Sequence, residues 1–405
     1  CFFPYTEFIG IINKTCMQVC SMLMPNYQDG SIVNIMSTME EAYGLEHAYG
    51  TLKGLDPGEI GEFRNVVFIL IDGLGYQYLG THQRDSFIHD KVLTRITSVF
   101  PTTTSASITS LATGVAPQQH AVTGWFMHLK EVGVVSQILP FNPRIGGMMF
   151  SDIGLTPSMF IDRGLIFDRL PVDCTCIIKD DIIASAFSSF MAGMSERVAY
   201  VGLEGFFKRI REACAGEHPK KFIYAYWSHF DTLCHLYGVD NEATHAHFRE
   251  IDDGLRSLYE DLSGSDTCII VTADHGQLDV TDETTVQLSD HPSILNCMTL
   301  PICGEARAAF CYVRPRLANS FERYVEDELG EYCALLKGHE MIEEGFFGSG
   351  EPNPRLFDRV GDYVLMMKDN YVIRDRLLGE REHVLKGYHG GLDSEELYVP
   401  LLYLT

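Results

Sequence analysis

Acidic and histidine side chains directly follow stretches of sequence that predict buried strands. Asp72 follows the apolar run at residues 66–71, and the adjacent pair Asp274 and His275 follows a second run at residues 267–272. Continuous apolar runs of this kind are typical of strands buried on both faces of a parallel sheet. Open α/β sheets bind ligands beyond the carboxyl ends of their strands, so we expect these side chains at a ligand-binding edge. Taken alone, Asp72 could equally cap a helix or form a turn.

Two further segments contribute side chains of the same types. A third apolar run, residues 221–227, leads into Asp231 and His235, and His389 lies in a glycine-rich segment before the last predicted strand. On a helical turn Asp231 and His235 share one face and could bind one ion. A plain surface ion pair is the alternative for these two residues.

A segment rich in threonine and serine, residues 100–114, offers hydroxyl groups at the start of a predicted helix that ends at Gly114. A hydroxyl at a helix start can cap the first turn. It can also act as a nucleophile, because free backbone N–H groups and the helix dipole attract a phosphate there. Thr104 is the candidate nucleophile.

Together these segments supply three carboxylates and three imidazoles. This mixture of oxygen and nitrogen donors suits Zn²⁺, with Mn²⁺ and Fe²⁺ as competitors. No cysteine is among them, which argues against a closed structural zinc site. A catalytic zinc usually keeps three protein ligands, so six donors indicate two sites.

The order of these motifs resembles that of the type I phosphodiesterase/nucleotide pyrophosphatase family of the alkaline phosphatase superfamily. The motifs are Ile-Asp72-Gly, Phe-Pro-Thr-x-Thr104, Asp231-x-x-x-His235, Ala-Asp274-His275-Gly and Gly-x-His389-Gly. The resemblance implies a doubly wound, mostly parallel α/β sheet flanked by helices, with two divalent metal ions. It also assigns the ligands: Asp231, His235 and His389 for one ion, and Asp72, Asp274, His275 and Thr104 for the other.

Coordination by a divalent cation lowers the pKa of bound water from about 15.7 to about 7 and favours an alkoxide in the same way. We therefore expect Thr104 to attack phosphorus and form a phosphothreonine that water hydrolyses. Where nucleotide pyrophosphatases carry Phe-Pro-Asn after the nucleophile, this chain has Ser105, Ala106 and Ser107. Without the phenylalanine, this position has no aromatic ring to stack on a nucleobase. The Ser107 hydroxyl is a candidate contact to the substrate phosphoryl group.

The expected function is hydrolysis of a small phosphodiester or pyrophosphate. A phosphomonoesterase or a phosphonoacetate hydrolase on the same scaffold is the alternative, since the metal ligands do not determine the substrate. A metal-stabilised binding module without turnover is the alternative from another class of protein.

The remaining pattern predicts one catalytic domain over residues 1–405, with a small α+β lid inserted at residues 281–374. An amphipathic helical pattern covers residues 8–44, and residues 243–262 predict a helix on which His245 and His247 are exposed. The remaining predicted strands cover residues 175–179, 198–201 and 398–404. Within the lid we expect a strand at 308–313, a helix at 321–336, a hairpin at 362–373 and a mobile loop at 345–354.

Fifty-five acidic residues against 31 lysines and arginines give a net charge of -24. Nucleic-acid polymers are therefore excluded as partners, because phosphate backbones are bound by clustered cations. The apolar run at residues 8–24 contains Asn13 and Lys14, so no membrane insertion is expected. Twelve cysteines without a Cys-x-x-Cys pair indicate reduced thiols and a cytoplasmic location. A secreted or periplasmic location stays open because the chain begins with cysteine, and the oligomeric state is unknown.

Overall fold

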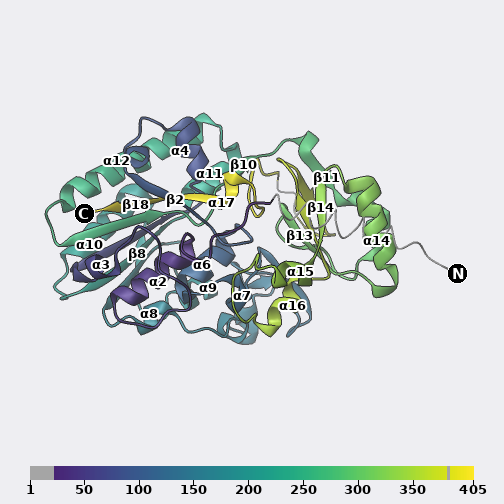
Figure 1. Cartoon of the computed structure of the whole chain (residues 1–405), viewed down its shortest axis with the longest axis horizontal. Coiled ribbons are helices and arrows are strands. Elements are labelled where there is room, and N and C mark those ends of the chain that lie inside the picture. Colours follow the sequence, from purple (N-terminus) through teal and green to yellow (C-terminus); the bar gives the residue numbers. More distant parts are fainter. Residues whose placement is uncertain (1–21, 381–383) are drawn as a thin grey trace.

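The computed structural model describes residues 22–380 and 384–405. It contains two seven-stranded sheets. The larger α/β part and the second sheet lie at opposite ends of the long axis of the molecule (Figure 1). The segments that carry the predicted site residues meet between these two parts.

The central sheet has the strand order β2-β18-β9-β1-β8-β6-β7. Five neighbouring strands, from β9 to β7, run parallel, and β18 pairs antiparallel with both β9 and β2. The bounds are β1 (Asn65–Ile71), β2 (Val92–Thr97), β6 (Asp173–Lys179), β7 (Glu196–Tyr200), β8 (Lys221–Trp227), β9 (Thr267–Thr272) and β18 (Tyr398–Leu404). The expected mostly parallel α/β sheet is confirmed. The sequence pattern does not predict strand β2, because this edge strand buries only its last two residues.

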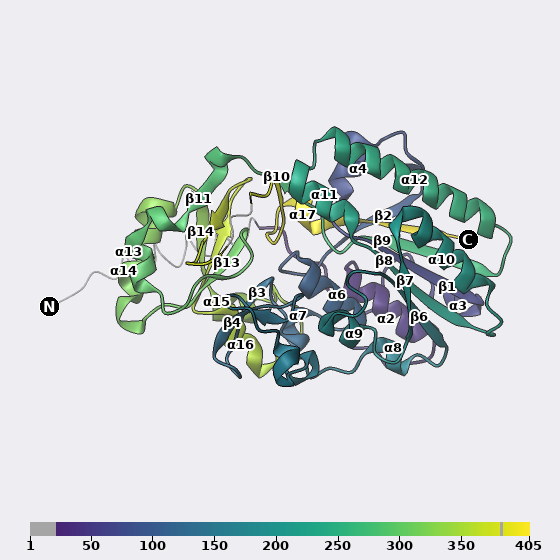
Figure 2. The same ribbon diagram turned by 180° about the vertical axis from the view of Figure 1, so that it is seen from behind.

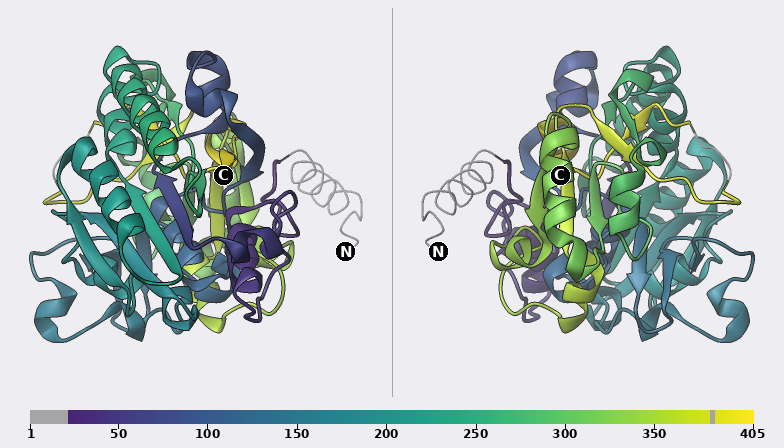
Figure 3. Two further views of the ribbon diagram at one scale, coloured as in Figure 1. Left: turned by 90° about the vertical axis from the view of Figure 1, so that its left-hand side faces the viewer. Right: turned by 90° about the vertical axis from the view of Figure 1, so that its right-hand side faces the viewer.

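Helices cover both faces of this sheet (Figures 1 and 2). One layer consists of α4 (Tyr76–His82), α5 (Phe87–Asp90), α10 (Gly202–Ala215), α11 (His229–Tyr237) and α12 (Glu242–Leu262). The other consists of α2 (Ile32–Ala42), α3 (Pro57–Glu62), α6 (Thr104–Thr113), α8 (Ile166–Arg169) and α9 (Ala186–Met191). Seen end-on, the two layers lie on opposite sides of the strands (Figure 3).

Helix α2 is shorter and more deeply buried than the amphipathic pattern at residues 8–44 predicts. Every residue from Ile32 to Glu40 is buried, because α2 packs against both α3 and α6. The Asn34 amide is accommodated inside by hydrogen bonds to the carbonyls of Tyr27, Gln28 and Gly50. Residues 8–21 of the predicted helix lie outside the described part of the chain.

The second sheet is antiparallel, with the order β14-β15-β13-β12-β3-β4-β5. Four of its strands come from residues 281–374: β12 (Cys303–Gly304), β13 (Ala308–Cys311), β14 (Cys333–Lys337) and β15 (Tyr363–Met367). The other three are β3 (Phe126–Leu129), β4 (Val134–Gln137) and β5 (Asn142–Pro143). The insertion and this earlier segment therefore form one sheet.

Within residues 281–374, one prediction is correct in its first half only and another is wrong. The helix predicted at 321–336 is confirmed as far as Leu329, as α14 (Ala318–Tyr324) continued by a π-helix (Val325–Leu329). Its second half is wrong, because β14 follows there and pairs with β15. The hairpin predicted at 362–373 does not form. β15 pairs with β13 and β14, whereas β16 (Val372–Arg374) pairs in parallel with β11 (Thr285–Gln287). Tertiary pairing, which local periodicity does not show, decides both cases.

The loop at residues 345–354, for which the sequence predicts mobility, is anchored in the core. Phe346 and Phe347 are fully buried and pack on Phe100, with ring centroids 6.0 and 5.1 Å away. Phe346 also accepts a hydrogen bond at its carbonyl from the Tyr27 hydroxyl at 2.9 Å. The loop thereby supports the segment that leads into α6.

The remaining elements are short. They are α7 (Pro117–His120), α13 (Pro292–Cys297), α15 (Gly338–Glu343), α16 (Pro354–Val360), α17 (Ser394–Leu397), β10 (Leu278–Asp279) and β17 (Gly387–Tyr388), together with 3₁₀ turns at Phe150–Ile153, Pro157–Met159, Asp282–Thr284, Leu288–Asp290 and Pro315–Leu317. Among the described residues, none of the helices has the length and apolar character to span a membrane.

A buried ion pair joins the two parts of the molecule. Arg307, in the turn between β12 and β13, donates from Nη2 to Glu396 Oε2 at 2.9 Å, and both side chains are almost completely buried. Glu396 Oε1 also accepts from the backbone N–H of Gly391 at 2.7 Å, two residues beyond His389. The pair thus holds the His389 segment between the second sheet and α17.

Removing the arginine from this pair will strongly destabilise the fold. Arg307→Met leaves the Glu396 carboxylate buried without its counter-charge, and breaking such a pair costs about 3–5 kcal/mol. We expect this decrease in the free energy of unfolding, measured by urea denaturation. The control is Lys130→Met, which removes an exposed ion pair with Asp358 and should cost about 1 kcal/mol or less. Equal losses in the two variants would contradict the role given to Arg307.

Candidate active site

The aligned ends of three parallel strands position the acidic residues. Ile71 pairs with Trp227 in β8, and Leu70 pairs with Thr272 in β9, so β1, β8 and β9 end side by side. Asp72 and Asp274 follow β1 and β9 at the same level. The backbone N–H of Gly73 donates to Asp274 Oδ1 at 3.0 Å. Gly73 has φ of +77°, and an added Cβ would meet Asp231 at 3.1 Å, so glycine allows the three acidic segments to approach.

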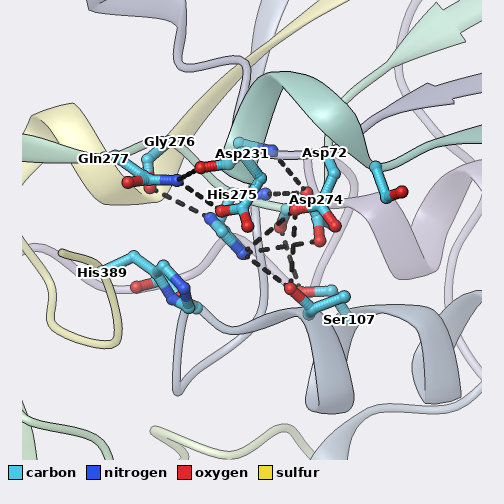
Figure 4. Close-up of polar contacts among 12 residues, drawn as sticks. Asp72, Ser107, Asp231, Asp274, His275, Gly276, Gln277 and His389 are labelled. Carbon is cyan, nitrogen blue, oxygen red and sulfur yellow. Dashed lines mark hydrogen bonds and ion pairs between the residues drawn. The ribbon is translucent and has the colours of Figure 1, made fainter. Parts of the chain in front are cut away.

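The first group of side chains contains Asp72, Asp274 and His275, all buried (Figure 4). His275 Nε2 lies 3.6 Å from Asp72 Oδ1 and 3.5 Å from Asp274 Oδ2. Thr104 is the first residue of α6, and its Oγ1 lies 3.1 Å from His275 Nε2 and 3.5 Å from Asp72 Oδ1. The hydroxyl predicted as nucleophile is therefore in contact with this group.

The second group contains Asp231, His235 and His389, whose potential ligand atoms all lie within 4.8 Å of one another. Asp231 and His235 share one face of α11, as their spacing predicts, with Oδ1 and Nε2 3.4 Å apart. His389 follows β17 and stacks on His275, with ring centroids 3.8 Å apart. The stacked rings bring the second group directly against the first.

All three histidines are oriented in the same way. The Nδ1 atoms of His235, His275 and His389 lie 2.8, 3.1 and 2.9 Å from backbone carbonyl oxygens, those of Gly387, Gly276 and Thr102. An Nδ1–H that donates to a carbonyl leaves Nε2 as the basic nitrogen, the arrangement usual for histidines that bind metals. These backbone contacts thus leave the Nε2 lone pair of each histidine available to bind a metal ion.

The electrostatics of both groups suit divalent cations. Burial, followed by repulsion from Asp274 and Asp231, raises the pKa of Asp72 well above its usual range, and burial also raises the pKa of Asp231. Burial and the neighbouring His275 and His235 hold the pKa of His389 well below its usual range. Asp274 Oδ2 is buried without a hydrogen-bond partner. Cations would stabilise the carboxylates and bind this unpaired oxygen, so the residues fit metal ions.

Two residues that the sequence analysis did not identify support the acids. The Tyr226 hydroxyl, from β8, donates to Asp72 Oδ2, and the Gln277 amide donates to Asp231 Oδ1. In the sequence Tyr226 looks like one of several aromatic core residues of β8. Gln277 lies two positions after His275, and this proximity was the only signal that could have identified it.

Glu305 is a third residue that the sequence analysis missed. It lies in the turn between β12 and β13, where its Oε1 accepts from the Trp125 backbone N–H at 2.6 Å and its carboxyl group bonds the Thr103 side chain. Burial raises the pKa of Glu305 to about 7, against the lowering effect of these two bonds. Gly390 permits the approach, since an added Cβ would lie 2.3 Å from Glu305 Cβ. The second sheet therefore places a carboxyl group beside the residue preceding Thr104.

Ser107 lies on α6, three residues after Thr104. Its side chain is fully buried, and its hydroxyl donates to the backbone carbonyl of Asp274 at 3.0 Å. This bond fixes the turn after β9 to α6. The contact between Ser107 and the substrate phosphoryl group stays a prediction.

A family model described as type I phosphodiesterase/nucleotide pyrophosphatase matches residues 66–138 and 178–392, more than half of the chain. Among curated protein sequences, none matches this chain.

Several solved structures have the same fold. The murine ectonucleotide pyrophosphatase/phosphodiesterase 5 is 18% identical with a TM-score of 0.63, over 83% of this chain and 87% of that one. The human protein of the same name is 16% identical with a TM-score of 0.62, over 84% and 87%. A phosphonoacetate hydrolase from Sinorhizobium meliloti 1021 is 16% identical with a TM-score of 0.61, over 84% and 90%.

Removing the Tyr226 hydroxyl will weaken metal binding at the Asp72 group. Loss of a hydrogen bond to a ligand typically costs 10- to 100-fold in metal affinity, and we expect roughly tenfold for Tyr226→Phe. Zinc affinity is measured by competition with a chelator. The matched control is Tyr224→Phe, two residues earlier in β8, whose ring stacks on Phe68. An unchanged affinity in Tyr226→Phe would show that this bond does not support a metal ligand.

Proposed function

Because the chain belongs to the type I phosphodiesterase/nucleotide pyrophosphatase family, a family of hydrolases acting on phosphorylated small molecules, we propose that it cleaves a small phosphodiester or pyrophosphate with Thr104 as the nucleophile. The observation that carries this proposal is the position of Thr104 Oγ1. It lies at the start of α6, within 3.5 Å of both Asp72 and His275.

The proposed metal ligands follow the two groups of side chains. Asp231, His235 and His389 would hold one ion, and Asp72, Asp274 and His275, with Thr104, the other. The donor set favours Zn²⁺, with Mn²⁺ and Fe²⁺ as competitors. When bound, two divalent cations activate a hydroxyl or water and stabilise the attacking and leaving oxygens of an in-line displacement.

The chain's own residues determine where the reaction takes place. Thr104 Oγ1 forms a bond to phosphorus while the bond to the leaving oxygen breaks, and water then cleaves the phosphothreonine and restores the hydroxyl. The first turn of α6 directs backbone N–H groups towards the phosphoryl oxygens. The hydrogen bond from His389 Nδ1 to the Thr102 carbonyl, at 2.9 Å, keeps this imidazole beside the nucleophile segment.

The residues around Thr104 bear on the choice of substrate. An inactive threonine-to-alanine variant of the murine protein was solved in complex with AMP, and the bacterial hydrolase in complex with phosphonoacetate. In this chain Ser105, Ala106 and Ser107 are all fully buried, so the first turn of α6 offers no surface for stacking a nucleobase. When it is ionised, above its pKa of about 7, Glu305 adds a negative charge next to Thr103. A singly charged diester suits this environment better than a phosphomonoester or phosphonoacetate, which carry additional negative charge.

Replacing the proposed nucleophile tests the mechanism. We expect Thr104→Ala to lower kcat for bis-p-nitrophenyl phosphate by on the order of 10³-fold or more, since a catalytic unit fails when its nucleophile is removed. Thr109→Ala is the control, because the Thr109 hydroxyl bonds a backbone carbonyl of the same helix, at 2.6 Å. A Thr104→Ala enzyme with most of its activity would disprove the assignment. Metal-loaded wild-type protein that hydrolyses no phosphate ester would instead favour a binding module.

The charge of Glu305 is tested by substrate preference. We expect Glu305→Gln to raise kcat/KM for p-nitrophenyl phosphate relative to bis-p-nitrophenyl phosphate by roughly tenfold, the effect of about 1.4 kcal/mol in charge repulsion. Assays above pH 8 keep the wild-type carboxyl group ionised. Glu340→Gln removes the same charge from an ion pair with Lys337 on the surface and serves as the control. An unchanged ratio in Glu305→Gln would exclude Glu305 from substrate discrimination.

A further inference from the structure

A third group of potential ligands lies outside the two groups around Thr104. It consists of His82, Asp240 and His245, whose donor atoms all lie within 4.8 Å of one another. His82 ends α4, Asp240 lies in the loop between α11 and α12, and His245 lies in the first turns of α12. The sequence analysis interpreted His245 as an exposed helix residue, but its side chain is only 15% exposed.

The separations of the donor atoms match a tetrahedral ion. Asp240 Oδ1 lies 3.1 Å from His245 Nε2 and 3.5 Å from His82 Nδ1. Zinc bonds of about 2.0–2.1 Å place two ligands of a tetrahedron about 3.3 Å apart. A distance of 3.5 Å is long for an N–H···O hydrogen bond. The Asp240–His245 contact is also a hydrogen bond, whereas the Asp240–His82 contact is too long for one. Both distances fit pairs of ligands around one tetrahedral ion.

The surroundings of His245 resemble the outer contacts of a metal ligand. Its Nδ1 lies 3.0 Å from the Tyr78 hydroxyl, which also accepts from the Gln83 amide at 3.2 Å. Such a bond at one ring nitrogen orients the other towards a metal. The His82 and His245 rings lie with centroids 4.9 Å apart, which places both imidazoles beside the Asp240 carboxylate.

The loop that carries Asp240 is held in place independently of the histidines. The Asp279 carboxylate accepts from the backbone N–H groups of Val239 and Asp240, at 2.6 and 3.0 Å. Asn241 caps α12 by accepting from the N–H of Ala243. The Asp240 side chain is itself 71% exposed, which leaves room for a water ligand in the fourth position. The backbone is thus pre-arranged while the site remains accessible.

We propose that His82, Asp240 and His245 form a third divalent-metal site of the zinc type, separate from the catalytic groups. Two imidazoles and one carboxylate with an open position are a common donor set for zinc. The site would connect three segments. α4 begins four residues after Asp72, and α11 carries Asp231 and His235 before it reaches the Asp240 loop. A bound ion would therefore fasten the far ends of two segments whose near ends hold the catalytic groups.

The test is the zinc content of the whole protein after saturation and removal of free metal. Asp240→Asn is the decisive variant, because asparagine keeps the size and a hydrogen-bonding oxygen but loses the charge that favours a cation. We expect wild type to bind one zinc ion per chain more than Asp240→Asn or His82→Ala. His89→Ala, on neighbouring α5 with a side chain 39% exposed, should bind as much as wild type.

A second readout separates this site from the catalytic groups. Zinc that binds the folded state raises the Tm, and wild type should show a larger increase than Asp240→Asn at the same zinc concentration. Zinc content and Tm are measured without any catalytic assay. The test of the third metal site therefore stands whether or not Thr104→Ala shows that Thr104 is the nucleophile. Equal zinc content and equal increases in Tm would overturn the proposal and identify the group as an ion pair only.

Discussion

Three carboxylates held close together beyond the ends of β1, β8 and β9, two of them buried and that of Asp231 14% exposed, are the constraint on which the site depends. Asp72, Asp231 and Asp274 are brought together by strand register, and their mutual repulsion in a buried environment disfavours the charged forms. Such a cluster is stable only when cations or protons compensate the charge. Because the Nδ1 atoms of the three histidines face backbone carbonyls, their Nε2 atoms are available to bind cations. This donor set favours compensation of the charge by metal ions over compensation by protons.

The second sheet supports this cluster from the opposite side. Arg307 binds Glu396, Glu305 reaches Thr103, and Phe346 and Phe347 pack on Phe100. Each contact acts on a segment that carries Thr104 or His389. The antiparallel part of the molecule therefore completes the site by positioning two segments that the parallel sheet does not hold by itself.

The sequence predicted the strands and the positions of the candidate site residues correctly where a local pattern, such as an apolar run or a helical spacing, determines the structure. The strands β8, β9 and β18 are predicted with their observed bounds and β1 to within one residue, because each is a continuous apolar run. The Asp231–His235 spacing also predicts a shared helix face. Strands β3, β4, β5 and β14 were missed because they are short and stabilised by pairing with other segments. Tyr226, Gln277 and Glu305 escaped detection since their roles depend entirely on which acid or hydroxyl they contact.

The position of β18 has a consequence for the order in which the protein is assembled. This strand lies between β9 and β2, so β2 joins the sheet only after β18 has been synthesised. Asp72, Asp274 and His275 are all available earlier, whereas the group with Asp231 and His235 waits for His389. During synthesis on the ribosome, all donors of the Asp72 group are therefore made more than a hundred residues before His389 completes the other group.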